Sequence, residues 1–220
     1  MIKINLQLFG GRGASSPGAV PNGGGGSKEN WSNGAGTRVE TDPVKALGAQ
    51  GRPKGVEDAT LKTNPNHSYE YSEYSENCQR CVVAYEARRR GYDVTAQPTY
   101  QGDQMPYNGN YKKEYFQGAK TENVGATSER KAVNNLESKM RDYGDGSRAL
   151  VEVQWKSGGG HVFMAEQKNG KTIYRDPQVG VRYDSKTLLT NVRTSSVSVT
   201  RVDNLKFTDN IGGAVTKDKY

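Results

Sequence analysis

Cys78, His161 and Asp176 are the residues whose types could together perform covalent chemistry. Cys78 opens the run Cys78-Gln-Arg-Cys81, His161 follows three glycines, and Asp176 precedes a proline. A thiol becomes a nucleophile when a histidine takes its proton, and a carboxylate can orient that histidine and stabilise its charged form. We therefore expect a Cys–His–Asp hydrolase if local structure brings these three side chains together.

The position of Cys78 depends on a predicted helix over residues 78–90. Asn77 is a good N-cap, Gly91 is a good C-terminal stop, and apolar residues recur along one stripe (Cys78, Val82 and Tyr85). Free N–H groups and the helix dipole favour a thiolate at position 78, whereas Cys81, one turn further in, gains less. The alternative is that both cysteines are small buried hydrophobic residues.

The Cys-x-x-Cys spacing also suggests redox chemistry or a metal site. Thioredoxin-like pairs follow a buried strand, whereas this pair follows the polar run Tyr-Ser-Glu-Tyr-Ser-Glu-Asn. A zinc site would need two further ligands, and the chain has only His67 and His161 as histidines and no second cysteine pair. We expect neither a metal nor another cofactor.

Asn169-Gly170 predicts a tight hairpin that carries His161 and Asp176 on its two arms. If these two residues form the turn, paired residue numbers sum to 339, Gln178 lies opposite His161, and Asp176 is the diagonal neighbour on the same face. Gln178 is therefore a candidate supporting residue, as is Asn77 beside the nucleophile. The alternative is an ordinary sheet histidine, with Asp176 simply beginning the Asp-Pro turn.

The remaining elements predict an α+β fold in which a nucleophile helix precedes a mostly antiparallel sheet. A second helix is expected from the cap at Thr127 to Gly144, a short helix over 185–192, and an irregular arm over 99–126. Strands are expected over 92–96, 149–155, 161–167, 171–176 and 196–202.

Composition divides the chain into four segments. Residues 1–12 alternate apolar and polar side chains and read as a docking-strand-like leader, or as a leader without function. Residues 13–67 are a Gly/Pro/Ser-rich linker expected to be disordered, because they contain too few apolar residues to bury. Residues 68–208 form the predicted domain, and 209–220 a flexible C-terminal tail.

Charge and hydropathy bear on the classes of partner. The net charge of +7 is shared between residues 1–67 and the remainder, at +3 and +4, so it does not mark a basic nucleic-acid-binding domain. Arg88-Arg89-Arg90 fits a solvated helix C-terminus. No apolar run reaches transmembrane length, and the N-terminus lacks the features of a signal peptide. We expect no membrane partner and no nucleic acid.

The stretches around these residues resemble the papain-fold toxin domain, a relative of bacterial glutamine deamidases. The resemblance rests on Asn77-Cys78-Gln-Arg-Cys81 and on Gly160-His161-Val-Phe with Asp176-Pro-Gln178, and it covers about residues 68–205. It implies a papain-like cysteine hydrolase fold with Cys78 as nucleophile, His161 as base and Asp176 as orienter. A papain-type oxyanion glutamine has no counterpart before Cys78.

Residues 1–11 separately resemble the opening of structural proteins of tailed phages. The resemblances imply a protein-glutamine deamidase that acts on a host protein, with a phage capsid or portal partner bound through residues 1–10. The resemblances also imply that the protein is located in a phage virion or in the host cytoplasm. A cysteine protease shares the same thioester step. A virion structural protein without enzymatic activity is the third hypothesis.

Overall fold

The computed structural model describes residues 43–100 and 110–217. The docking strand expected over residues 1–12 lies outside the described residues, as does the part of the expected linker before Pro43. Within the described ranges, no helix combines the length and apolar character needed to cross a membrane.

A six-stranded antiparallel sheet forms one half of the molecule, in the order β2-β7-β3-β4-β5-β6. Its strands are β2 (Glu122–Asn123), β3 (Arg148–Gln154), β4 (Gly160–Lys168), β5 (Lys171–Asp176), β6 (Val181–Tyr183) and β7 (Ser198–Arg201). The predicted hairpin register is confirmed, since pairs run from Lys168–Lys171 to Met164–Arg175. Asn169 and Gly170 both adopt positive φ, as a tight two-residue hairpin turn requires.

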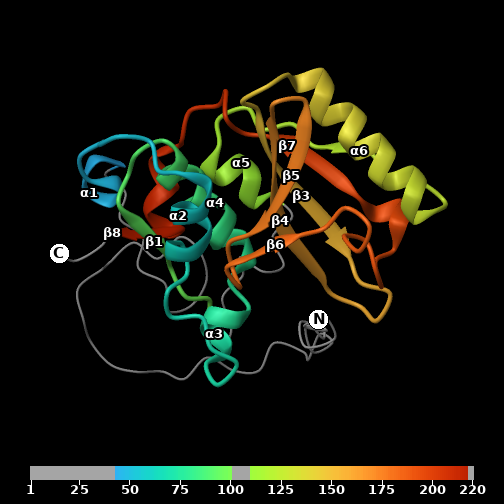
Figure 1. The fold of residues 1–220 in the computed structure, drawn as a ribbon. Helices are drawn as coiled ribbons and strands as arrows, with labels where there is room; N and C mark the ends of the chain where they lie inside the picture. Colours follow the sequence, from blue (N-terminus) through green and yellow to red (C-terminus); the bar gives the residue numbers. More distant parts are fainter. Residues whose placement is uncertain (1–42, 101–109, 218–220) are drawn as a thin grey trace.

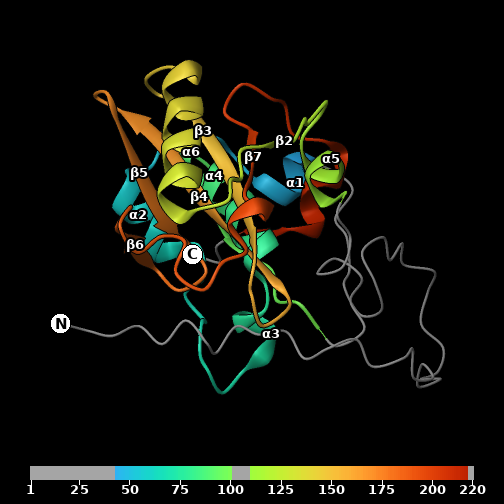
Figure 2. The ribbon, with the colours of Figure 1, turned by 90° about the vertical axis from the view of Figure 1, so that its right-hand side faces the viewer.

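Two helices cover the opposite faces of this sheet (Figures 1 and 2). α6 (Glu129–Tyr143) buries Ala132, Leu136 and Met140 against one face, whose residues include Val151 and Phe163. α4 (Cys78–Arg89) packs on the other face with Leu150, Val162 and Met164. The alternation of β3 and β4 side chains between these clusters follows from the two-residue period of a strand. The α+β fold class is therefore confirmed.

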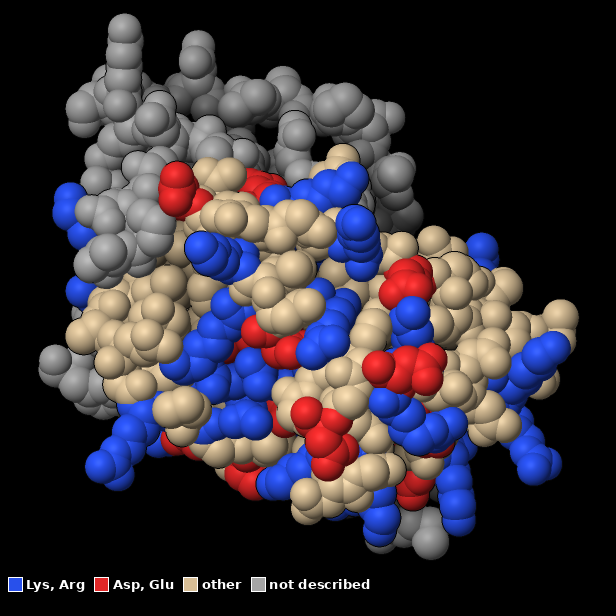
Figure 3. Space-filling model, turned by 90° about the horizontal axis from the view of Figure 1, so that it is seen from above, with Lys and Arg blue, Asp and Glu red and all other residues tan. Residues whose placement is uncertain are grey.

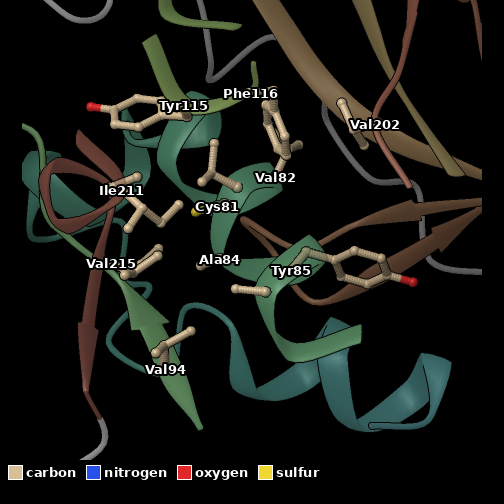
Figure 4. Close-up of a cluster of buried hydrophobic side chains, with 14 of the residues drawn as sticks. Cys81, Val82, Ala84, Tyr85, Val94, Tyr115, Phe116, Val202, Ile211 and Val215 are labelled. Atoms are coloured by element: carbon tan, nitrogen blue, oxygen red, sulfur yellow. The ribbon is translucent and has the colours of Figure 1, made fainter. Parts of the chain in front are cut away.

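α4 is the central element of the second half of the molecule. Every residue from Arg80 to Arg88 is buried, so the expected single apolar stripe understates how completely the helix is covered. α1 (Pro43–Leu47), α2 (Val56–Lys62), α5 (Tyr111–Tyr115), the 3-10 helix η4 (Asp209–Gly213) and the pair β1 (Val94–Ala96) and β8 (Val215–Lys217) surround it. Figure 4 shows side chains of several of these elements meeting around Val82 and Ala84.

The helix ends where the sequence predicts, because Gly91 has a φ of 104°. A Cβ at this position would lie 2.3 Å from the carbonyl oxygen of Gly51. The two chain segments approach closely here, and Gly51 N donates a hydrogen bond to Gly91 O at 2.9 Å. Both the left-handed conformation and this close approach require glycine.

The segment boundaries expected from composition need correction at both ends. The expected linker includes residues 43–67, yet these contain α1 and α2, and Ala46, Leu47 and Ala59 are buried in the same hydrophobic cluster as residues of α4. The expected tail over 209–220 contains η4 and β8, and Ile211 and Val215 are buried. Individually these stretches are too short and polar to predict, and their few apolar residues become buried only through tertiary contacts within the cluster around α4.

Three expected local features are also wrong. The irregular arm over 99–126 contains α5, whose Tyr111 and Tyr115 are fully buried, and β2. Residues 185–192 form no helix: their backbone bonds link residues three apart, from Thr187 N to Asp184 O and from Thr190 N to Thr187 O. The apolar residues of that stretch lie in successive turns, in which Leu188 and Leu189 are buried. Ser128, rather than Thr127, caps α6 through its bond from Lys131 N.

The Arg88-Arg89-Arg90 run is not a solvated helix end. Arg88 pairs with Asp58 at 2.9 Å, Arg89 with Glu166 at 2.7 Å, and Arg90 with Glu86 at 2.7 Å. Local sequence cannot reveal these pairs because two of the three acidic partners lie on other elements. Viewed from above, the described surface carries acidic side chains interspersed among the basic ones (Figure 3).

Candidate active site

The start of α4 places Cys78 at the edge between the helix and the sheet. The backbone carbonyl of Asn77 accepts bonds from Arg80 N at 2.9 Å and Cys81 N at 3.0 Å, which fixes the first turn. Cys78 is partly exposed, whereas Cys81 is fully buried. Of the two thiols, only Cys78 therefore combines access to solvent with a position at a helix N-terminus.

His161 and Asp176 form a buried pair, as the hairpin register predicts. His161 lies near the start of β4, Asp176 ends β5, and His161 Nε2 lies 2.7 Å from Asp176 Oδ2. Their side chains are 4% and 1% exposed. The indole ring of Trp155 stacks on the imidazole with ring centres 6.0 Å apart. Sheet geometry and packing thus restrict the orientation of the imidazole.

The other side of the imidazole faces Cys78. Burial lowers the pKa of His161, but the charge of Asp176 and hydrogen bonds to Asp176 and Cys78 outweigh it and raise the pKa to about 10. Since Nε2 is bonded to Asp176, Nδ1 is the ring nitrogen available to the thiol. The structure thus brings Cys78, His161 and Asp176 together, with His161 between the other two.

Asp176 is kept ionised despite its burial. Burial raises the pKa of this carboxyl, but the charge and hydrogen bond of His161, the Tyr183 hydroxyl and the backbone N–H of Gln178 together hold it below its usual range. The Tyr183 hydroxyl donates to Oδ2, and Gln178 N donates to Oδ1 at 3.0 Å. No local sequence pattern predicts β6, so the sequence alone does not point to Tyr183.

Gln178 lies beside the site but not opposite His161 in a strand. Pairing along β4 and β5 stops at Met164–Arg175, and a turn carries residues 177–180 into β6. Pro177 cannot donate a ladder bond, which explains why the hairpin ends there. Gln178 is buried and connects two parts of the site: its backbone bonds Asp176, and its side-chain Nε2 lies 3.4 Å from Asn77 Oδ1.

Asn77 occupies the N-cap position without forming the expected cap. Its side chain makes no capping bond. Instead, Nδ2 donates to Asn64 Oδ1 at 3.2 Å and to Gln97 O at 3.0 Å, while Oδ1 accepts from Cys81 Sγ at 3.2 Å. The Asn64 amide in turn donates to Gln178 O at 2.9 Å. The buried amides of Asn64 and Asn77 therefore join separate chain segments directly behind Cys78.

Three further observations bear on the groups that could ionise or bind a metal. Burial raises the pKa of the Cys81 thiol well above its ordinary value, with the charges of Cys78 and Asp176 adding to the effect. Burial lowers the pKa of His67, although the charge of Asp176 opposes this. Among the residues that the structure describes, no cluster of three His, Cys, Asp or Glu side chains could hold a metal ion.

A helix that presents a cysteine at its N-terminus to a histidine and an aspartate on an antiparallel sheet defines the papain-like fold class. Residues 76–181 match the family model described as papain fold toxin 1, glutamine deamidase. The matched range contains Cys78, His161 and Asp176. It supports a thiol-dependent, deamidase-like function in general, with a protein as substrate. Comparisons with curated proteins and with solved structures gave no match.

Proposed function

We propose that this chain is a protein-glutamine deamidase with Cys78 as nucleophile, His161 as general base and acid, and Asp176 as the residue that orients His161. One observation carries the proposal: the buried 2.7 Å contact between His161 Nε2 and Asp176 Oδ2 leaves Nδ1 to the thiol at the start of α4. This arrangement favours a thiolate–imidazolium pair before substrate arrives.

The reaction follows from these positions. The Cys78 sulfur bonds the carboxamide carbon of a substrate glutamine, and the backbone N–H of Cys78 is the natural donor to the developing oxyanion. The C–N bond then breaks, and His161 gives its Nδ1 proton to the leaving ammonia. Water attacks the resulting thioester while His161 takes one of its protons, and glutamate and the thiol are released. Asp176 stabilises the imidazolium at both steps.

Labelling of the two cysteines tests the proposed nucleophile. With limiting iodoacetamide at mildly acidic pH, Cys78 should be alkylated much faster than the buried Cys81, and His161→Gln should markedly slow the labelling of Cys78. Peptide masses report each thiol separately. Equal, slow labelling of both cysteines in the wild-type protein would contradict an activated nucleophile.

Substrate mass then separates deamidation from proteolysis. A glutamine-containing protein substrate should gain about one dalton without fragmentation, because ammonia is the leaving group. Cys78→Ser should lower the rate by at least roughly 10³-fold while leaving the fold intact, as judged by thermal unfolding. Substrate fragments with new termini would instead favour the cysteine protease.

A further inference from the structure

Large hydrophobic side chains are exposed at only a few described positions. They are Leu61, Tyr69, Tyr71 and Tyr100, with exposed fractions of 62%, 66%, 57% and 47%. These residues are up to 39 positions apart in the sequence. Scattered exposed apolar residues need no explanation, but a group of them beside a candidate active site indicates binding.

The buried amides hold the segments that carry these side chains together. Asn64 Nδ2 donates to Tyr74 O at 2.8 Å and to Gln178 O at 2.9 Å. Thr99 N donates to Glu73 O at 2.8 Å, which places Tyr100 next to α3 (Ser72–Ser75). Residues 61–64, 68–76, 97–100 and 178–180 therefore meet beside Asn77, the residue before Cys78.

Leu61 lies beside the 178–180 segment, which meets the other segments at Asn64. Its Cδ2 lies 3.7 Å from the position that a Cβ on Gly180 would take, two residues after Gln178. We call residues 69–76 together with Leu61 and Tyr100 the tyrosine–glutamate rim. In both ribbon views α3 projects at the lower end of the molecule, whereas α6 lies at the upper end (Figures 1 and 2).

The charge of the rim is opposite to that of the whole chain. Residues 69–76 contain Glu70, Glu73 and Glu76 and no lysine or arginine, although the chain carries a net charge of +7. Glu70 and Glu76 are exposed. The neighbouring Lys62 pairs with Asp58 at 2.9 Å, so part of its charge is balanced there.

We propose that the tyrosine–glutamate rim docks the substrate protein through lysine or arginine side chains that flank the target glutamine. The inference rests on the proposed deamidase function and specifies its substrate class. Carboxylates attract these cations, and the faces of exposed tyrosines bind them through cation–π contacts. Tyrosine also supplies a large contact area at a low cost in conformational entropy.

Two otherwise identical peptides test this specificity, one with lysines on both sides of a single glutamine and one with glutamates. The full chain should deamidate the lysine peptide with a KM roughly ten-fold lower, since each exposed ion pair contributes a factor of about 1.5 to 5. Added salt should reduce the difference, because the charges are exposed. Equal KM values for the two peptides would overturn the proposal.

Matched charge variants locate the effect. Glu70→Lys should raise KM for the lysine peptide about three- to ten-fold and leave kcat unchanged. Glu129→Lys changes the net charge equally at an exposed position of α6, and it should alter neither parameter. Tyr71→Ser should raise KM for the lysine peptide at both low and high salt. Equal effects of Glu70→Lys and Glu129→Lys would overturn the assignment to the rim.

Binding without turnover separates this proposal from the proposed function. Fluorescence anisotropy of the labelled peptides with Cys78→Ala should show the same preference for lysine. Preferential binding without deamidation by the wild-type protein would refute the deamidase and keep the docking rim. Deamidation without a lysine preference would support the deamidase and refute the docking rim. A dimer that Glu70→Lys dissociates, with no peptide preference, would assign the rim to a second copy of the chain.

Discussion

At the residue scale, Asp176 is the group on which the state of His161 depends. The carboxylate is held by His161, by the Tyr183 hydroxyl and by Gln178 N, so it has little freedom to turn. Replacing Asp176 with asparagine removes the charge but keeps a similar shape. The Asp176→Asn substitution therefore separates the electrostatic effect on the His161 imidazole from a simple loss of packing.

We expect Asp176→Asn to lower kcat for deamidation by about 10²- to 10⁴-fold, because the imidazolium loses its counter-charge. NMR titration should show a lower pKa for His161 in this variant. Tyr183→Phe is the matched control: it removes one donor to Asp176 and should cost about 1.5–3 kcal/mol of stability with a much smaller effect on kcat. An unchanged His161 titration in Asp176→Asn would contradict the proposed pairing.

The same pair predicts how stability depends on pH. The pKa of His161 rises from its ordinary value of 6.5 to about 10, because the favourable interactions with Asp176 and Cys78 outweigh the opposing effect of burial. Its stabilising effect is complete below pH 6.5 and is lost as the pH rises through about 10. The pKa of Asp176 is lowered from 3.8. Its contribution is present above pH 3.8 and is lost as the pH falls through the lowered value.

Urea unfolding of the wild type and of His161→Gln should therefore differ most between pH 3.8 and 6.5. The difference in unfolding free energy should shrink steadily toward about pH 10. Glu129→Gln, at an exposed position on α6, provides the control and should show no such trend. A difference that stays constant over this range would mean that the imidazole is not charged in the folded protein.

At the element scale, the hairpin and the nucleophile helix could be predicted because their signals are local. Asn169-Gly170 fixes the turn, the turn fixes the register, and the register brings Asp176 near His161. Asn77 and Gly91 likewise mark the ends of α4. Tyr183 and Asn64 were missed because their roles depend on partners on other elements, and no local pattern marks those contacts.

The arginine run shows the same limit through its ion pairs. Glu86 is fully buried and faces two cations, with Arg90 Nε 2.7 Å from Oε1 and Arg148 Nε 2.7 Å from Oε2. Arg148 lies on β3, so the network attaches α4 to the sheet. Only the pair at positions 86 and 90 has the i, i+4 spacing of a local helical ion pair.

We expect Glu86→Gln to lower the free energy of unfolding by about 3–5 kcal/mol, because two largely buried guanidinium groups lose their counter-charge. Chemical denaturation would measure the change. Glu122→Gln is the control, since Glu122 pairs with Lys139 at 2.6 Å but its side chain is 48% exposed. That substitution should cost less than about 1 kcal/mol. Similar losses in the two variants would show that burial does not matter to the Glu86 network.

At the scale of the whole molecule, both ends of the described chain close around α4. α1 packs on η4 and β8, and β8 pairs with β1. Ile211 and Val215 therefore belong to the same buried cluster as Cys81 and Val82 (Figure 4). The helix that presents Cys78 is thus supported by residues more than 100 positions later in the chain.

Ile211→Ala should destabilise this half by about 2–5 kcal/mol, because it leaves a cavity against α4. If opening of the cluster exposes Cys81, its alkylation should become at least roughly 30-fold faster under native conditions. The exposed Thr216→Ala should change stability by less than about 0.5 kcal/mol and leave this rate unchanged. A less stable Ile211→Ala protein with unchanged Cys81 labelling would show that the C-terminal elements open independently of the nucleophile helix.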